Sequence, residues 1–200
     1  MTQKPKTPQK ENPEVSQTRD FFRTPKYAVD LLIPYIPQQI KNIWECASGE
    51  GHISKVLIDK GYSVFSSDII PNQYIHNFIL DDFPIFTFEM IITNPPFSLK
   101  QKFYKKCLEY SIPFALLIPA DYSKWIIDAI RFDGCEKIIP SRRIDYITPS
   151  NKKGSSSASQ FHSMWLTRGF NLGKSETFVE LTNEMKKNVE PNYTIKRWFY

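Results

Sequence analysis

The feature that most constrains the fold is an alternation of short, continuous apolar runs with stretches of helical periodicity. Such runs are typical of strands buried on both faces, as in a parallel sheet. The runs fall at residues 42–45, 62–67, 90–93, 113–118 and 137–139, and the helical patterns at 24–36, 53–60, 99–110 and 122–132. We therefore predict an α/β fold with a doubly wound, mostly parallel sheet.

The C-terminal part of the chain departs from this alternation. Residues 161–166 form one more apolar run, which we predict to be the last strand and the one antiparallel strand of the sheet. The spacing of Phe178, Leu181 and Met185 predicts a helix over residues 175–189. Residues 193–200 fit either a strand or an aromatic and basic contact surface.

The length and composition favour one domain. The chain has 200 residues, of which 41% are apolar, enough for a single core. Residues 1–18 are polar, so we predict a disordered tail there. We assign residues 19–169 to the domain and residues 170–200 to an extension packed on or beside it.

The composition gives no sign of a membrane span or a metal site. The sequence has no run of 18 apolar residues and no apolar signal-peptide core at its polar N-terminus. The cysteines, Cys46, Cys107 and Cys135, are widely spaced, which fits a reducing compartment without disulfides or a zinc cluster. We expect a cytoplasmic monomer that binds neither a membrane nor a metal.

The positive charge is concentrated at the C-terminal end. The net charge is +5, and residues 141–200 carry ten basic and five acidic side chains, whereas residues 21–140 have a net charge of −1. Basic surface beside a site suits a polyanionic substrate such as nucleic acid. The alternative is that these charges serve only solubility.

The tetrapeptide Asn94-Pro95-Pro96-Phe97 directly follows the apolar run at 90–93. The two prolines stiffen the turn, because proline fixes φ near about −65° and has no N–H. The Asn94 amide oxygen and a nearby carbonyl could accept both hydrogens of an amino group while Phe97 stacks on a planar ring. Such a corner suits methylation of an aromatic exocyclic amine. The alternative is an ordinary turn that closes a strand.

A turn rich in small residues follows the run at 42–45. It contains Glu45, Ala47, Gly49 and Gly51, and glycines let a backbone approach a ligand closely. No Lys-Ser or Lys-Thr pair follows, so it is not a phosphate-binding P-loop. The glycine pattern is also incomplete for a nicotinamide cofactor, which disfavours an oxidoreductase.

Two further acidic positions are candidates for binding a nucleoside. Asp68 follows the run at 62–67 and suits the hydroxyls of a ribose, while Asp82 and Phe83 could contact an adenine ring. The alternatives are a turn cap at Asp68 and a solvated loop acid at Asp82. Because parallel strands end at one edge of a sheet, Glu45, Asp68, Asp82 and Asn94 are predicted to gather there.

In this order and spacing, these segments resemble the S-adenosyl-L-methionine-dependent adenine-N6 DNA methyltransferases, over about residues 21–165. The resemblance implies a Rossmann-like class I methyltransferase fold with S-adenosyl-L-methionine as cofactor. It implies catalytic roles for Asn94, Pro95, Pro96 and Phe97. It implies cofactor contacts from Phe22, Thr24, Pro25, Glu45, Ala47, Gly49, Gly51, Asp68, Asp82 and Phe83.

The resemblance also points to substrate contacts after residue 140. Residues 141–146 are similar to the family segment that supplies a second aromatic wall for the target base, here Tyr146. Arg142, Arg143, Lys152 and Lys153 are candidate contacts to the substrate. The glycine- and serine-rich loop at 151–157 could become ordered on the substrate or serve as a plain connector.

The tetrapeptide does not fix the substrate. Many DNA-modifying relatives have Asp and Tyr where this chain has Asn94 and Phe97, and enzymes that methylate RNA adenine or protein glutamine share the Asn-Pro-Pro start. We predict methylation of adenine in DNA, and keep those two activities or an inactive nucleic-acid-binding protein as alternatives. A cytosine-C5 enzyme is excluded because the chain has no Pro-Cys pair. The small size suits a phage enzyme that acts in the host cytoplasm.

Overall fold

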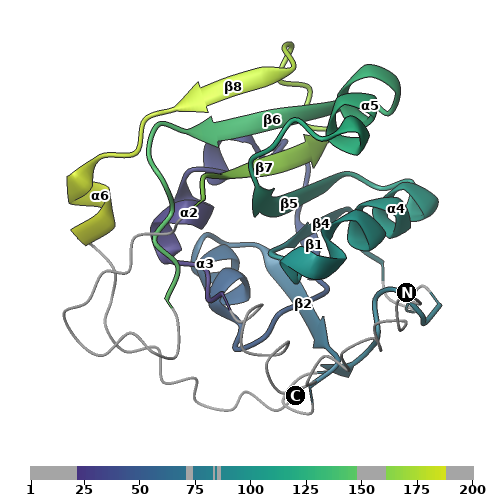
Figure 1. Ribbon diagram of the computed structural model, residues 1–200. Coiled ribbons are helices and arrows are strands. Elements are labelled where there is room, and N and C mark those ends of the chain that lie inside the picture. Colours follow the sequence, from purple (N-terminus) through teal and green to yellow (C-terminus); the bar gives the residue numbers. More distant parts are fainter. Residues whose placement is uncertain (1–21, 71–73, 83, 85–86, 148–160, 188–200) are drawn as a thin grey trace, which may run out of the picture.

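One sheet of eight strands organises the part of the chain that the computed structural model describes, residues 22–70, 74–82, 84, 87–147 and 161–187. The strand order is β3-β2-β1-β4-β5-β7-β6-β8 (Figure 1). The strands are β1 Asn42–Glu45, β2 Ser63–Asp68, β3 Tyr74–Ile75, β4 Met90–Thr93, β5 Phe114–Pro119, β6 Cys135–Pro140, β7 Ser163–Arg168 and β8 Glu176–Val179.

The strand directions confirm the predicted mixed sheet. Strands β3, β2, β1, β4 and β5 pair in parallel, and β6 pairs in parallel with β8. Strand β7 is antiparallel to both of its neighbours, with Leu166 opposite Leu116 of β5 and Lys137 of β6. Residues 161–166 were predicted to form this strand, and residues 163–166 form its first part.

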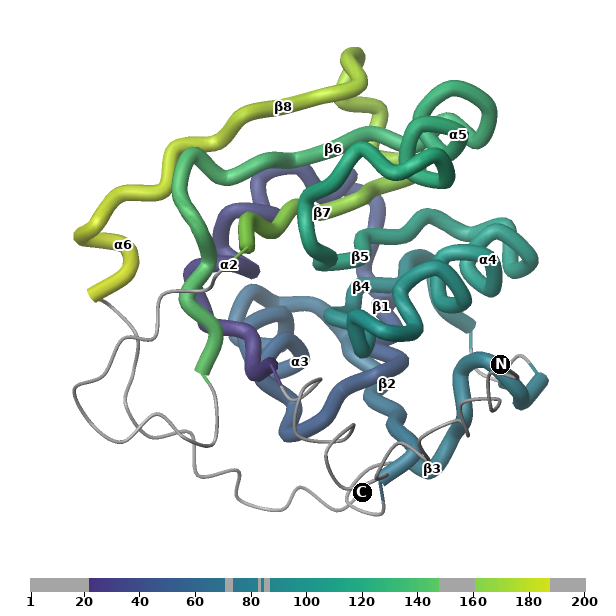
Figure 2. The backbone as a smooth tube through the Cα atoms, viewed as in Figure 1, coloured from purple at the N-terminus to yellow at the C-terminus, as the bar shows by residue number. Residues whose placement is uncertain are grey.

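Helices cover both faces of the sheet (Figures 1 and 2). They are α2 Lys26–Asp30, η1 Ile33–Tyr35, α3 His52–Asp59, η2 Phe97–Leu99, α4 Lys100–Tyr110, α5 Lys124–Phe132 and α6 Asn183–Lys187. Ile92 and Leu117 belong to the same core cluster as residues of α2 and α3, whereas Ile91 and Leu116 pack with α4 and α5. The strands are therefore buried on both faces, which explains their continuous apolar runs.

Two predicted elements differ from the structure. The helix predicted at 175–189 is wrong in its first part, because residues 176–179 form the edge strand β8 beside β6, and α6 begins only at Asn183. Buried Thr177 and Val179 alternate with exposed Phe178, the period of a strand. The helix predicted at 24–36 ends early, and a 3-10 turn that contains Pro34 follows.

The direction in which strands are added reverses beside β1. Strand β2 lies on one side of β1 and β4 on the other, so the carboxyl ends of β1 and β4 flank the switch point where ligands bind in open α/β sheets. Within the described ranges, no helix has both the length and the apolar character needed to cross a membrane. The predicted tail at 1–18, the loop at 151–157 and the segment 193–200 lie outside those ranges.

Candidate functional site

The turn after β1 is fastened to the end of β2. The backbone N–H of Gly49 donates to the Asp68 carboxylate at 2.7 Å, and the N–H of Ser48 donates to the Ser67 carbonyl at 3.1 Å. Gly49 and Gly51 have φ values of +52° and +77°, where other residues are strained. The structure therefore brings Gly49, Gly51 and Asp68 together, as the sequence predicts.

Glu45 lies beneath this turn with an exposed fraction of only 1%. Its carboxylate accepts a hydrogen bond from the Ser54 backbone N–H at 2.7 Å and another from the Ser54 hydroxyl, so it holds the first turn of α3. Burial raises the pKa of Glu45 to about 8, although the hydrogen bonds from Ser54 oppose this shift. The carboxylate predicted to contact the cofactor is thus engaged inside the protein.

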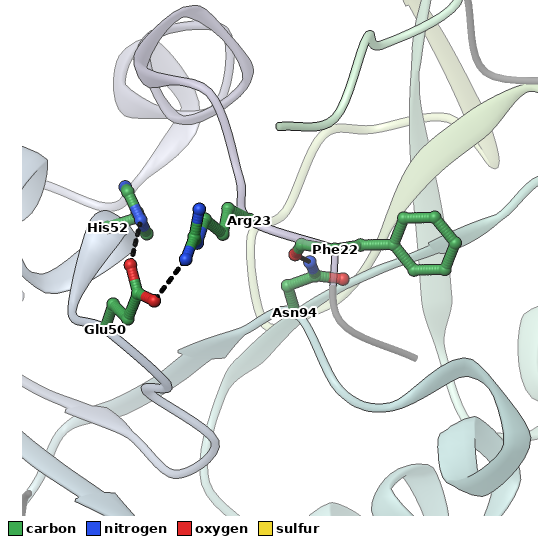
Figure 3. Close-up of polar contacts among 5 residues, drawn as sticks. All are labelled: Phe22, Arg23, Glu50, His52 and Asn94. Carbon is green, nitrogen blue, oxygen red and sulfur yellow. Dashed lines mark hydrogen bonds and ion pairs between the residues drawn. The ribbon is translucent and has the colours of Figure 1, made fainter. Parts of the chain in front are cut away.

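Asn94 follows the last residue of β4, and its amide nitrogen is held by the N-terminal segment. Its Nδ2 donates to the Phe22 carbonyl at 2.8 Å (Figure 3). The same nitrogen donates to Thr24 Oγ1 at 3.1 Å. The Asn94 Oδ1 atom is buried and accepts no hydrogen bond from any described residue. The amide therefore has a fixed donor end and a free acceptor end.

The segment 22–25 contacts both the glycine turn and the chain near Ile147. Arg23 forms an ion pair with Glu50 of the glycine turn at 2.5 Å, and Glu50 also lies 3.4 Å from His52 Nε2 (Figure 3). On its other side, Arg23 exchanges two backbone hydrogen bonds of 3.1 Å with Ile147. Burial lowers the pKa of His52, an effect that the nearby Glu50 carboxylate counteracts. A continuous chain of contacts thus joins the glycine turn to Asn94.

Four aromatic rings cluster beside Asn94. The rings of Phe22 and Phe97 stack with centroids 4.9 Å apart and an interplanar angle of 22°. Phe161 and Tyr146 approach Phe97 in edge contacts at 5.3 and 5.8 Å. The Tyr146 ring is buried, and its hydroxyl donates to Ser163 Oγ at 2.9 Å. The predicted walls Phe97 and Tyr146 are therefore together, but they are packed by rings of the protein itself.

The other predicted site residues are exposed, adjoin residues of the site in the sequence, or fall outside the described ranges. Arg142 and Arg143 are exposed, and Arg142 donates to the Asn183 side chain at 2.8 Å. The prediction that Asp82 lies at a strand end is wrong, because it is exposed on a loop between β3 and β4 and the residues directly before it form a turn. Pro25 directly precedes α2, and Pro96 directly precedes η2. Ala47 lies in the glycine turn and Pro95 follows Asn94. Phe83, Lys152 and Lys153 fall outside the described ranges.

Sequence reasoning missed Arg23, Glu50, His52 and Phe161. Arg23 and Glu50 were adjacent to predicted site residues, and their opposite charges were the available signal for a pair. Phe161 was visible only as the start of a predicted strand. In the part of the chain that the structure covers, no three histidine, cysteine or acidic side chains are grouped as metal ligands would be.

Comparison with known proteins identifies the fold. No protein-family model matches the sequence, and no curated protein matches it. A candidate RNA methyltransferase from Pyrococcus horikoshii superimposes with a TM-score of 0.58 at 17% identity, covering 78% of this chain and 88% of that one. A type I restriction-modification methyltransferase subunit from Streptococcus thermophilus gives a TM-score of 0.52 at 12% identity, covering 80% of this chain and 47% of that one. The fold is that of class I methyltransferases, as predicted.

Proposed function

We propose that this protein is an S-adenosyl-L-methionine-dependent methyltransferase that acts on the exocyclic amine of adenine in DNA. The observation that carries the proposal is the Asn94 amide, whose nitrogen is held while its buried oxygen has no partner among the described residues. An unpaired buried acceptor is costly, so such an atom needs an explanation. An amino group that donates to it provides one.

The residues around the glycine turn fit the proposed cofactor. Asp68 is oriented by the N–H groups of Gly49 and Ile70, at 2.7 and 3.2 Å, and its remaining lone pairs suit ribose hydroxyls. The buried Ser48 hydroxyl in the same turn makes no hydrogen bond to any described residue and is another possible partner. When bound, S-adenosyl-L-methionine supplies a methyl group on a positively charged sulfur.

The corner at Asn94 would activate the amine by position alone. Asn94 Oδ1 and the Pro95 carbonyl would each accept one amino hydrogen, which directs the nitrogen lone pair out of ring conjugation and toward the methyl group. The amine nitrogen would accept the methyl group as that group leaves the sulfur, and the surplus amine proton would be released to water. Positioning and fixed dipoles are sufficient for this reaction, so the site needs no strong base.

The aromatic cluster would have to open before a base could stack on Phe97. The face of Phe97 next to Phe22 is covered by the Phe22 ring. A base that stacks on that face would take the place of this ring. Stacking a base on an aromatic side chain contributes about 1–3 kcal/mol, and an aromatic pair about 0.5–1.5 kcal/mol beyond its area. We infer that the base replaces the Phe22 ring while the Phe22 carbonyl keeps its bond to Asn94.

The charge distribution supports nucleic acid as the substrate. Residues 141–200, which follow Asn94 and Phe97 in the sequence and include Tyr146 and Phe161, carry an excess of five positive charges, which suits a phosphate backbone. A glutamine amide or an RNA adenine would fit the same two acceptors. These substrates therefore remain the competing possibilities.

The test is methyl transfer from labelled S-adenosyl-L-methionine to duplex DNA, single-stranded DNA, total RNA and protein extract in parallel. The proposal requires label in DNA. Label only in RNA or protein would move the enzyme to the competing substrates. Cofactor binding without transfer to any of the four would favour a binding protein with an inactive methyltransferase fold.

A further inference from the structure

The orientation of the Asn94 amide is determined by its two partners. The Phe22 carbonyl, 2.8 Å away, can only accept a hydrogen bond, so the group that faces it must be the amide nitrogen. Thr24 Oγ1 lies 3.1 Å from the same nitrogen and accepts its second hydrogen. With both hydrogens used, the oxygen is directed away from the segment 22–25.

We propose that Thr24 is a positioning residue that locks the Asn94 amide, so that its oxygen and not its nitrogen meets the substrate amine. This inference rests on the proposed function. It assigns Thr24 a role toward Asn94 instead of the cofactor contact that the sequence resemblance implies. It also implies that position 94 requires an amide side chain and not a carboxylate.

The sequence around Thr24 restricts the positions that its side-chain hydroxyl can adopt. Thr24 precedes Pro25, which biases its backbone toward the extended region, and its β-branched side chain has few rotamers. Its exposed fraction is 4%, so water has little access to replace the bond. The backbone pairing of Arg23 with Ile147 fixes the preceding residue. The hydroxyl therefore reaches Asn94 from a segment that is itself held in place.

A carboxylate at position 94 would not fit the same surroundings. It would direct one oxygen at the Phe22 carbonyl oxygen, at the distance where the amide now donates, and two acceptors repel each other there. Only the protonated acid could donate to that carbonyl. The partners at Phe22 and Thr24 therefore distinguish this site from one that accepts a carboxylate.

The first test compares Thr24→Val, which keeps the shape and removes the hydroxyl, with Thr24→Ser, which keeps the hydroxyl. We expect kcat to fall by about tenfold in Thr24→Val, the effect of one lost hydrogen bond, and to recover in Thr24→Ser. The affinity for S-adenosyl-L-methionine should stay within about twofold of the wild type, because the proposal gives Thr24 no contact with the cofactor. Thr177→Val is a matched control, because Thr177 is buried in β8 and its hydroxyl makes no bond to any described residue. An unchanged kcat, or a loss confined to cofactor affinity, would overturn the proposal.

The second test uses Asn94→Asp, which serves if Thr24→Val does not fold. Because only a protonated acid can donate to the Phe22 carbonyl, the activity of this variant should rise as the pH is lowered from 8 to 6, whereas the wild type should not show this rise. A variant as active as the wild type at neutral pH would show that position 94 needs only an acceptor. That result would overturn the proposal.

A third measurement does not depend on activity. The side-chain NH₂ of Asn94, identified in an NMR spectrum by its loss in Asn94→Asp, should exchange slowly with solvent and exchange faster in Thr24→Val. Equal exchange in the two proteins would overturn the role of Thr24. If the wild type transfers no methyl group yet shows this difference, the lock stands and the proposed function fails.

Discussion

The carboxylate of Asp68 accepts a hydrogen bond from the backbone N–H of Gly49 at 2.7 Å, and this contact joins the end of β2 to the turn after β1. Asp68 therefore has one observed structural role and one proposed role. It shapes the glycine turn, and in the proposed function it would also accept hydrogen bonds from the ribose. A substitution at Asp68 should reveal both.

Asp68→Ala should weaken the binding of S-adenosyl-L-methionine by about tenfold or more, the effect of losing hydrogen bonds to a charged group. Asp68→Asn keeps an oxygen for Gly49 and should lose less affinity. Isothermal titration measures both affinities. Asp128→Ala is the control, because Asp128 lies on α5, where it forms an i,i+4 ion pair with Lys124. An unchanged affinity in Asp68→Ala would refute the role of Asp68.

Asn94→Ala should abolish methyl transfer while leaving cofactor binding nearly intact. Removing one fixed group that stabilises a transition state typically lowers kcat by about 100- to 1,000-fold. Single-turnover kinetics and titration with the cofactor measure the two effects separately. Near-normal turnover in this variant would be incompatible with the proposed role of Asn94.

Phe97→Ala should weaken binding of the nucleic-acid substrate, because the base loses its stacking surface. A loss of about 1–3 kcal/mol corresponds to roughly 5- to 150-fold in affinity. Phe97→Tyr keeps the ring and should remain within a few fold of the wild type. Fluorescence of a DNA duplex with 2-aminopurine at the target position reports the stacking directly, and equal quenching by all three proteins would argue against it.

The raised pKa of buried Glu45 predicts that the stability of the protein depends on pH. Its pKa in the folded protein is raised from 4.5 to about 8, so its contribution is fully present below pH 4.5 and is lost as the pH rises through about 8. Glu45→Gln does not titrate and can still accept from the Ser54 backbone N–H. Between pH 5 and 8, the free energy of unfolding of the wild type should therefore fall relative to that of Glu45→Gln, by an amount of the order of a few kcal/mol.

Urea unfolding of both proteins at several pH values measures this difference. The control is the m-value, which should be the same for the two proteins if neither changes its unfolded state. Parallel stability curves over this pH range would contradict the raised pKa of Glu45.

The sequence predicted those parts of the site that depend on strand ends. Asp68 and Asn94 could be placed because parallel strands end at one edge, and the continuous apolar runs revealed the strands. The edge strand β8 was missed because the spacing of Phe178, Leu181 and Met185 also fits a helix, and pairing with β6 decided the outcome. The local periodicity of a sequence gives no information about which strands will pair in the folded protein.

The contacts that hold the site together could not be predicted in the same way. Arg23 and Glu50 are 27 residues apart, and Phe22 and Asn94 are 72 apart. Nothing in the local sequence specifies which loop a segment will meet. The stacking of Phe22 on Phe97 likewise depends on how the segment 22–25 crosses the sheet edge. The roles of the individual site residues stay predictions until variants are measured.

The most direct test of the central claim is nucleoside analysis of unmethylated duplex DNA after incubation with S-adenosyl-L-methionine and either the wild type or Asn94→Ala. The account predicts N6-methyladenine in DNA treated with the wild type and almost none in DNA treated with the variant. If N6-methyladenine is absent from the wild-type reaction, or equally abundant in both, the central claim is contradicted.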